Sequence, residues 1–201
     1  MYLRPAFVET DTARIMSLIR DNPFGLLMTA GPDLDGSHIP FTVQETADGF
    51  RLAAHLSADN PQSAQLAGGR AMAVFSGPHA YIAPSWYQTQ PAVPTWDYCA
   101  VHVHGTLDLL TETAEIHANL RSLAEHDPGG FDLDAMPELY LRKMVAGTRG
   151  FTLTPTKIEA QWKMSQNRSQ ADRQSVMSAL RGQGDKLSGQ VADLIAVTLP
   201  T

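Results

Sequence analysis

The sequence predicts an α+β protein: an antiparallel β-barrel with flanking helices. Apolar residues make up 43% of the 201 residues, enough for one buried core. Short strand-like segments follow one another at hairpin-like spacing in the first half of the chain. Helical segments are inserted between or after these strands without regular alternation, which disfavours a doubly wound parallel sheet. A closed or nearly closed antiparallel barrel fits this order better.

The first half of the chain begins with a helix and continues with strands. Apolar residues at 15, 18 and 19 form the i, i+3, i+4 stripe of a helix that Thr10 or Asp11 caps and that runs to about Arg20. The other expected segments are a strand over 24–30, a turn-rich loop over 31–36, a strand over 39–46, a hairpin turn at Asp48-Gly49, an alternating strand over 50–56, a short helix between Asn60-Pro61 and Gly68-Gly69, and strands over 71–76 and 80–84 separated by Gly77-Pro78.

The second half is expected to contain the longest strand, over residues 96–110. Its alternation places Trp96 and Tyr98 on one face, and Asp97 and Cys99 on the other. The remaining expected segments are a loop over 88–94, helices over 111–125 and 137–145, a loop over 127–134, a strand over 151–158, and terminal helices over 169–180 and 189–199. The strand count is six or seven. We expect residues 1–165 to form the barrel domain and residues 166–201 to form a helical extension packed on it.

Charge and composition restrict the classes of function. The net charge is −6 and no run of Lys or Arg is present, so direct DNA binding is doubtful. A single cysteine, Cys99, excludes an internal disulfide and fits a reducing compartment. No apolar run approaches membrane-spanning length, and residues 1–10 lack the apolar core of a signal peptide. These features predict a cytoplasmic protein without membrane contact.

The first candidate site is residues 162–168, WKMSQNR. In seven residues it combines an indole, two fixed cations, a hydroxyl and two adjacent amides. A phosphate or an electron-rich ring suits such a set of donors. The same run is also consistent with a polar loop between a strand and a helix. The sequence contains neither GxGxxG nor a P-loop, so side chains must hold any phosphate-bearing cofactor.

The second candidate site is residues 55–62, HLSADNPQ. His55 and Ser57 share a strand face, and Asn60 lies just past the end of that strand. Three neutral hydrogen-bonding groups at this junction can hold a phosphate, helped by the N-terminus of the helix that follows. Capping of the strand end by the same polar side chains is the alternative.

Two further features are given neither a metal-binding nor a catalytic role. His102 and His104 stand at i and i+2 on one strand face, a geometry that metal sites use. Because Asp108 is the only carboxylate nearby, partly buried or interfacial histidines are the preferred interpretation, and no metal site is assigned. Cys99 shares its face with Val101 and is expected to be a buried, inert thiol.

Five segments in this order resemble the PaiB family, described as FMN-binding split-barrel proteins and negative transcriptional regulators. They are HIPF at 38–41, AHLSADNPQ at 54–62, FSGPHAYIAPSWY at 75–87, VPTWDYCAVHVHG at 93–105 and WKMSQNR at 162–168. The resemblance extends from Met1 to about Leu180. Five ordered segments make it far more specific than any one of them alone.

The resemblance implies a split β-barrel that forms a homodimer with FMN at the subunit interface. It is compatible with three roles: a PaiB-type transcriptional regulator, a flavin-dependent oxidoreductase or flavin reductase that uses NAD(P)H, or a binding module without flavin. No catalytic residue is assigned. The residues carried over as cofactor contacts are His55, Ser57, Asn60, Trp96, Lys163, Ser165, Gln166, Asn167 and Arg168.

Two positions depart from the family pattern. Asp97 stands where the family usually has Asn, and Ala58 stands where an Arg often precedes Asn60 by two residues. Both changes remove groups that favour an anion. Three arrangements are open for Asp97. It repels the flavin, or it is compensated by a local cation or by the flavin N3–H, or it faces away from the cofactor and binds backbone amides.

Overall fold

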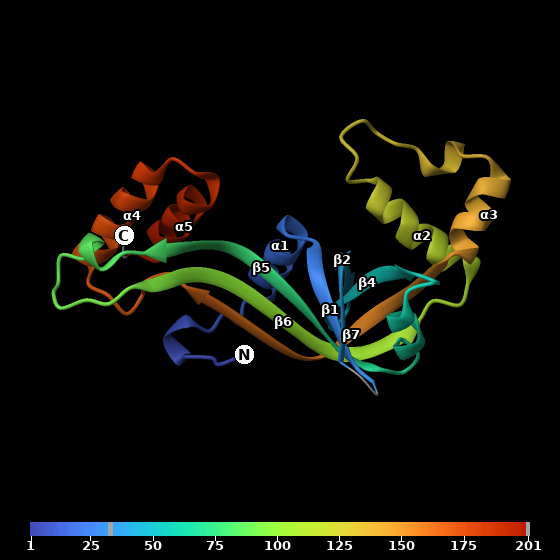
Figure 1. The fold of residues 1–201 in the computed structure, drawn as a ribbon, viewed down its shortest axis with the longest axis horizontal. Coiled ribbons are helices and arrows are strands. Elements are labelled where there is room, and N and C mark those ends of the chain that lie inside the picture. The colour runs from blue at the N-terminus through green and yellow to red at the C-terminus, as the bar shows by residue number, and fades with distance from the viewer. Residues whose placement is uncertain (32–33, 200–201) are drawn as a thin grey trace. The chain divides into compact units, whose positions relative to one another are not determined.

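The computed structural model describes residues 1–31 and 34–199, which contain seven strands and five α-helices (Figure 1). The strands form one sheet in the order β2-β1-β5-β6-β7-β4-β3. Their bounds are β1 (Phe24–Ala30), β2 (Leu34–Pro40), β3 (Thr42–Thr46), β4 (Gly49–Ser57), β5 (Arg70–Ile82), β6 (Thr95–Leu109) and β7 (Thr148–Lys163). The predicted α+β class and the upper strand count are confirmed.

The α-helices lie close to their expected positions. Their bounds are α1 (Thr12–Asp21), α2 (Thr113–Ala124), α3 (Glu138–Ala146), α4 (Gln170–Gln183) and α5 (Lys186–Val197). Ser169 and Asp185 cap α4 and α5, because their side chains accept hydrogen bonds from Asp172 N and Ser188 N. Gly184 ends α4 with φ 74°, a left-handed conformation that glycine adopts without a steric cost. Among the described residues, none of the helices is long and apolar enough to cross a membrane.

The strands of the first half of the chain pair in antiparallel fashion. β1 pairs antiparallel with β2 and with β5, β3 pairs antiparallel with β4, and β4 pairs antiparallel with β7. One strand was expected over 39–46, but the chain leaves β2 at Pro40 and enters β3 at Thr42. The reason is topological: β2 and β3 occupy opposite ends of the strand order. Residues 32 and 33 of the loop expected over 31–36 lie outside the described residues, and residues 34–36 belong to β2.

Two other predicted boundaries are wrong. β5 runs without a break through Gly77-Pro78. Its pairing with β1 covers only Ala71 to Val74, so Pro78 lies beyond it and its missing N–H costs no bond to β1. β7 reaches Lys163 rather than stopping at residue 158, so the first two residues of WKMSQNR are strand residues.

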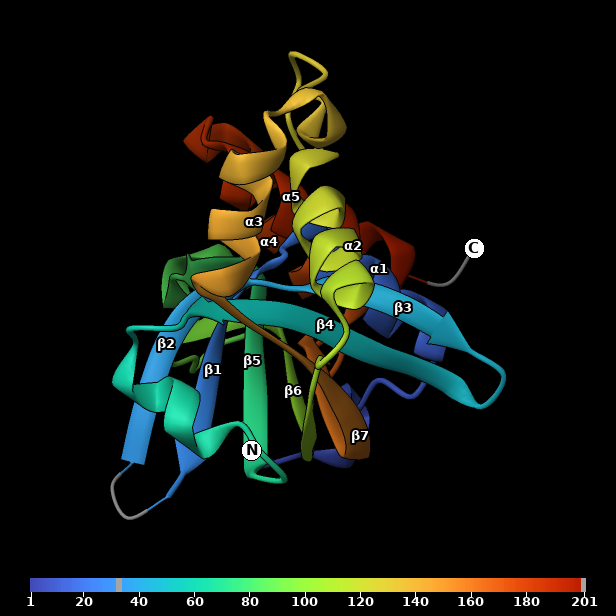
Figure 2. The same ribbon diagram turned by 90° about the vertical axis from the view of Figure 1, so that its right-hand side faces the viewer.

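The chain forms two compact units, which are described separately. The first consists of Met1–Asp11, Ser76–Val101 and Glu159–Thr201, and the second of Thr12–Phe75 and His102–Ile158. In the first unit, α4 and α5 pack together (Figure 1) through fully buried side chains that include Val176, Leu180 and Ile195. In the second unit, α2 and α3 lie next to each other (Figure 2). In the same unit the Phe41 and Phe75 rings meet edge-on, with their centroids 5.2 Å apart.

Candidate functional site

Asp97 is the buried centre of a polar network in the first unit. Its side chain is fully buried, on the same side of β6 as Cys99. Ser165 Oγ donates to Asp97 Oδ2 at 2.6 Å, and Lys163 Nζ donates to Asp97 Oδ1 at 3.2 Å. Of the arrangements that the sequence left open, the structure therefore shows compensation by a local cation.

Lys163 uses its ammonium group entirely within this network. Besides Asp97, it donates to Thr95 Oγ1 at 2.7 Å and to the backbone carbonyl of Trp96. Three acceptors match the three protons of an ammonium group. Its side chain is only 19% exposed. Lys163 therefore joins the end of β7 to the start of β6, and its charge is neutralised locally.

Burial is the dominant influence on the Asp97 carboxyl group. Desolvation raises the pKa of Asp97 above its ordinary value, and the hydrogen bond from Ser165 and the charge of Lys163 oppose this rise without cancelling it. The folded protein therefore holds a proton on Asp97 at pH values where the unfolded chain has lost it. This contribution to stability is complete below the ordinary Asp pKa of about 4 and is lost as pH rises through the higher folded value.

We expect Asp97→Asn to flatten the dependence of stability on pH above about pH 4, because Asn does not titrate. The measurement is the free energy of unfolding by urea at a series of pH values. Asp193→Asn is the matched control, since Asp193 is exposed and pairs with Arg181. A variant whose profile runs parallel to that of the parent would show that Asp97 does not set the pH dependence.

The end of WKMSQNR forms a closed turn. Gln166 Oε1 accepts from Met164 N at 2.6 Å, and Gln166 Nε2 donates to the carbonyl of Trp162 at 2.6 Å. Ser165 has φ 54°, which is strained for a residue other than glycine and is sustained here by the Ser165–Asp97 bond. The Gln166 side chain is thus hydrogen-bonded to backbone groups of the turn itself. The side chain of Asn167 is exposed.

Arg168 is the cation that this turn presents. Its guanidinium carbon lies 4.3 Å from the centroid of the Tyr87 ring. Within the described part of the chain, no carboxylate forms an ion pair with Arg168. Asp172, in the first turn of α4, accepts from Thr89 N at 2.9 Å and so ties the Tyr87 loop to the helix that follows Arg168. The backbone N–H of Thr89 lowers the pKa of Asp172, which keeps this tie charged.

In the second unit, the side chains of HLSADNPQ have local partners. His55 Nδ1 lies 2.7 Å from Asn119 Oδ1, and Ser57 Oγ accepts from Asp59 N at 3.3 Å. Asn60 accepts from Gln62 N at 2.9 Å. Capping of the strand end, the alternative left open by the sequence, is therefore present. The helix expected after Asn60 is a 3-10 turn of five residues, η2 (Pro61–Gln65), too short to supply a substantial helix dipole.

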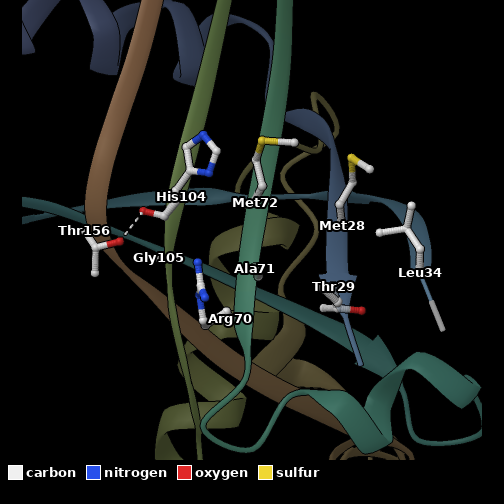
Figure 3. A pocket seen from close by; sticks show the side chains of 10 residues that line it. Met28, Thr29, Leu34, Arg70, Ala71, Met72, His104, Gly105 and Thr156 are labelled. Atoms are coloured by element: carbon white, nitrogen blue, oxygen red, sulfur yellow. Dashed lines mark hydrogen bonds between the residues drawn. The ribbon is translucent and has the colours of Figure 1, made fainter. Parts of the chain in front are cut away.

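Figure 3 shows a second feature of this unit, an open hollow of about 370 Å³. The Arg70 side chain reaches from β5 toward the part of β6 that carries His104, and Met28 and Met72 are cross-strand partners beside it. Among the described residues, no carboxylate pairs with Arg70. Sequence reasoning missed Arg70, whose only signal was a lone cation at the start of an apolar strand. His102 and His104 are half-buried and Cys99 is buried, as predicted.

Comparison with known proteins identifies the family. A family model described as "Putative FMN-binding domain" matches residues 1–157. The chain is 29% identical over 201 residues to "Protease synthase and sporulation protein PAI 2" of Bacillus subtilis (strain 168), covering 97% of this chain and 96% of that protein.

Solved structures share the fold. A conserved hypothetical protein of Mycobacterium tuberculosis matches with a TM-score of 0.62 and 14% identity, over 84% of this chain and 94% of that chain. The FAD and heme binding protein of Mycobacterium smegmatis matches with a TM-score of 0.60 and 15% identity, over 77% of this chain and 72% of that chain. The fold is the split barrel that the resemblance implied. The chain therefore belongs to the FMN-binding domain family, and the resemblance to the PaiB family carried by its five segments is confirmed.

Proposed function

We propose that this protein binds FMN and that Arg168 holds the phosphate. The observation that carries the proposal is the contrast between the two cations of WKMSQNR: Lys163 is neutralised by Asp97, whereas Arg168 has no carboxylate partner in the described chain. A guanidinium group binds phosphate through two parallel hydrogen bonds. Stacking on Tyr87 restrains Arg168 before the ligand arrives, which reduces the entropy lost on binding.

The other candidate contacts differ in whether a side-chain proton is still available for a hydrogen bond to the ligand. Ser57 accepts a hydrogen bond through Oγ, so its own O–H remains able to donate to a phosphate. Asn60 donates to Ser37 Oγ at 3.1 Å and accepts from Gln62 N, which leaves one amide proton. His55, Trp96, Gln166 and Asn167 stay in the proposed set as contacts of the remaining cofactor atoms. Ser165 is buried and donates its side-chain proton to Asp97, so it supports the turn that carries Arg168.

The test is a pair of fluorescence titrations of flavin-free protein, one with FMN and one with riboflavin. Both ligands have the same ring system, so the difference in affinity isolates the phosphate. We expect FMN to bind at least tenfold more tightly, since one charged hydrogen bond contributes about 1.5–3 kcal/mol. Equal affinities would remove the phosphate role, and failure of both ligands to bind would overturn flavin binding.

For the role of the bound flavin, we infer a PaiB-type regulatory function exercised without tight DNA binding by this chain alone. Arg173 lies on α4, the helix nearest to a recognition helix, but it is only 7% exposed and donates to Thr198 Oγ1. Arg181 on the same helix pairs with Asp193. Neither cation is free to neutralise DNA phosphates, the main source of non-specific affinity. A sequence-specific gel shift at nanomolar protein would contradict this inference.

The second candidate function is a flavin-dependent oxidoreductase or flavin reductase that uses NAD(P)H. It is favoured by a ring-lined hollow in the first unit, beside Trp96 and Lys163. Oxidation of NADH by the FMN-loaded protein, with excess free FMN as the electron acceptor and followed by absorbance, separates the two functions. Sustained turnover establishes the oxidoreductase, and its absence leaves the regulatory function.

We also propose an obligate homodimer in the cytoplasm. In the second unit, Phe24 is 67% exposed and Leu34 is 71% exposed, which leaves apolar surface for a two-fold contact. The single cysteine is buried and cannot form an internal disulfide, which suits a reducing compartment. Sedimentation measures the assembly directly. A folded monomer of 21.9 kDa at micromolar concentration would contradict the dimer.

A further inference from the structure

The first unit contains a hollow of about 410 Å³ between the N-terminal segment and the adjoining ends of β6 and β7. This volume lies within the range of small-molecule sites. The N-terminal segment is held in place by the buried Phe7, by a bridge between Val8 and Gln161, and by the bond from Glu9 N to the carbonyl of Ala160 at 3.0 Å. Residues lining the hollow include Tyr2, Arg4, Phe7, Trp96, Tyr98 and Gln161.

Aromatic side chains are prominent in the lining of this hollow, which includes Tyr2, Phe7, Trp96 and Tyr98. Trp96 is 53% exposed, an unusual exposure for an indole that has rings beside it. The Tyr81 ring meets the Trp96 ring edge-on, with the two ring centroids 6.1 Å apart. His79, on the same strand as Tyr81, also has its ring centroid 6.1 Å from that of Trp96. These neighbours restrain the indole without covering it. An exposed and restrained indole suits stacking against a planar heterocycle.

Gln161 and Tyr98 provide the polar part of the hollow. Gln161 is only 4% exposed, and its Nε2 donates to Tyr98 Oη. Gln161 Oε1 has no hydrogen-bond partner. Within the described chain, the Tyr98 O–H has no acceptor either. A buried acceptor without a partner destabilises the protein, so a ligand that supplies the missing donor recovers this energy.

Gln161 and Tyr98 therefore offer a ligand one hydrogen-bond acceptor and one donor side by side. Exchanging the nitrogen and oxygen of the Gln161 amide preserves this property. In that case Tyr98 O–H donates to Gln161, the amide nitrogen retains a free proton, and the phenol oxygen can accept. In either assignment the complementary group is an amide edge, with a carbonyl and an N–H on adjacent atoms.

We propose that this hollow binds a planar heterocycle that carries an amide edge, with the ring against Trp96 and the edge on Gln161 and Tyr98. The carboxamide of nicotinamide and the lactam edge of a flavin both have this chemistry. Arg4 lines the same hollow, lies 5.7 Å from the Phe7 ring and has no carboxylate partner among the described residues, so it suits a phosphate of the same ligand. The inference does not require FMN to bind at Arg168.

The experiment is a calorimetric titration with nicotinamide, on the full chain, both flavin-free and loaded with FMN. We expect Tyr98→Phe and Gln161→Met each to weaken nicotinamide by about tenfold, the effect of one lost hydrogen bond of about 1.4 kcal/mol. Tyr140→Phe is the matched control, because Tyr140 is an exposed tyrosine on α3 and should leave the affinity unchanged. N,N-diethylnicotinamide is the ligand control, because its amide lacks the N–H and should bind as weakly as nicotinamide binds the variants.

The titrations of flavin-free and FMN-loaded protein distinguish a nicotinamide ring from a flavin ring as the natural ligand of the hollow. If nicotinamide binds equally well with and without FMN, the hollow is a separate ring site. If FMN displaces nicotinamide, the natural occupant is the flavin edge, and Tyr98→Phe should then also weaken FMN. Nicotinamide affinity that is the same in Tyr98→Phe, Gln161→Met and the parent would overturn the proposal. So would absence of nicotinamide binding together with unchanged FMN affinity in both variants. Failure of FMN alone to bind would overturn only the proposed function.

Discussion

Replacing Lys163 by Met is expected to lower the free energy of unfolding by about 3 kcal/mol, the low end of the range for breaking a buried ion pair. Asp97 has no exposed surface, so removing its cation leaves a desolvated carboxylate with Ser165 as its remaining side-chain partner. Met preserves most of the length of the Lys side chain, which limits the contribution from lost packing. Urea denaturation at neutral pH measures the change.

Two further variants show whether the charge is responsible. Asp97→Asn combined with Lys163→Met should recover most of the lost stability, because the double variant contains no unpaired buried charge. Lys186→Met, at an exposed position at the start of α5, should change the free energy of unfolding by less than about 0.5 kcal/mol. A double variant no more stable than Lys163→Met would contradict this interpretation.

Replacing Arg168 by Ala is expected to weaken FMN by roughly ten- to hundredfold while leaving riboflavin affinity unchanged. The physical reason is the loss of a charge-assisted bond to the phosphate, worth about 1.5–3 kcal/mol. Flavin fluorescence titration measures both ligands. Arg168→Lys should retain part of the affinity, since it keeps the charge but not the two parallel bonds of a guanidinium group.

Arg181→Ala controls for the general loss of positive charge, because Arg181 pairs with Asp193 at the surface of α4. It should leave FMN affinity unchanged. An equal loss of FMN and riboflavin in Arg168→Ala would place Arg168 against the ring instead of the phosphate. Unchanged FMN affinity would exclude it from the site.

Local pattern in the sequence was sufficient for the class of most elements. The alternation over residues 96–110 correctly placed Asp97 with Cys99 on the buried face, because side chains of a strand alternate regardless of its neighbours. The apolar stripe at 15, 18 and 19 likewise predicted α1 to within two residues at its start and one at its end. Caps such as Ser169 act within one turn of a helix, so their residue types are visible in the sequence.

Tertiary structure decided which strands pair and how charges are compensated. The break between β2 and β3 at Phe41, and the continuity of β5 through Pro78, depend on the strand order, which no local pattern contains. The partner of Asp97 is 66 residues away in the chain, and only the adjacency of β6 and β7 makes Lys163 that partner. Residue type alone marked both Lys163 and Arg168 as cations for a phosphate. Their different surroundings follow from pairing between distant strands, because the electrostatic energy of a side chain depends on what the fold buries beside it.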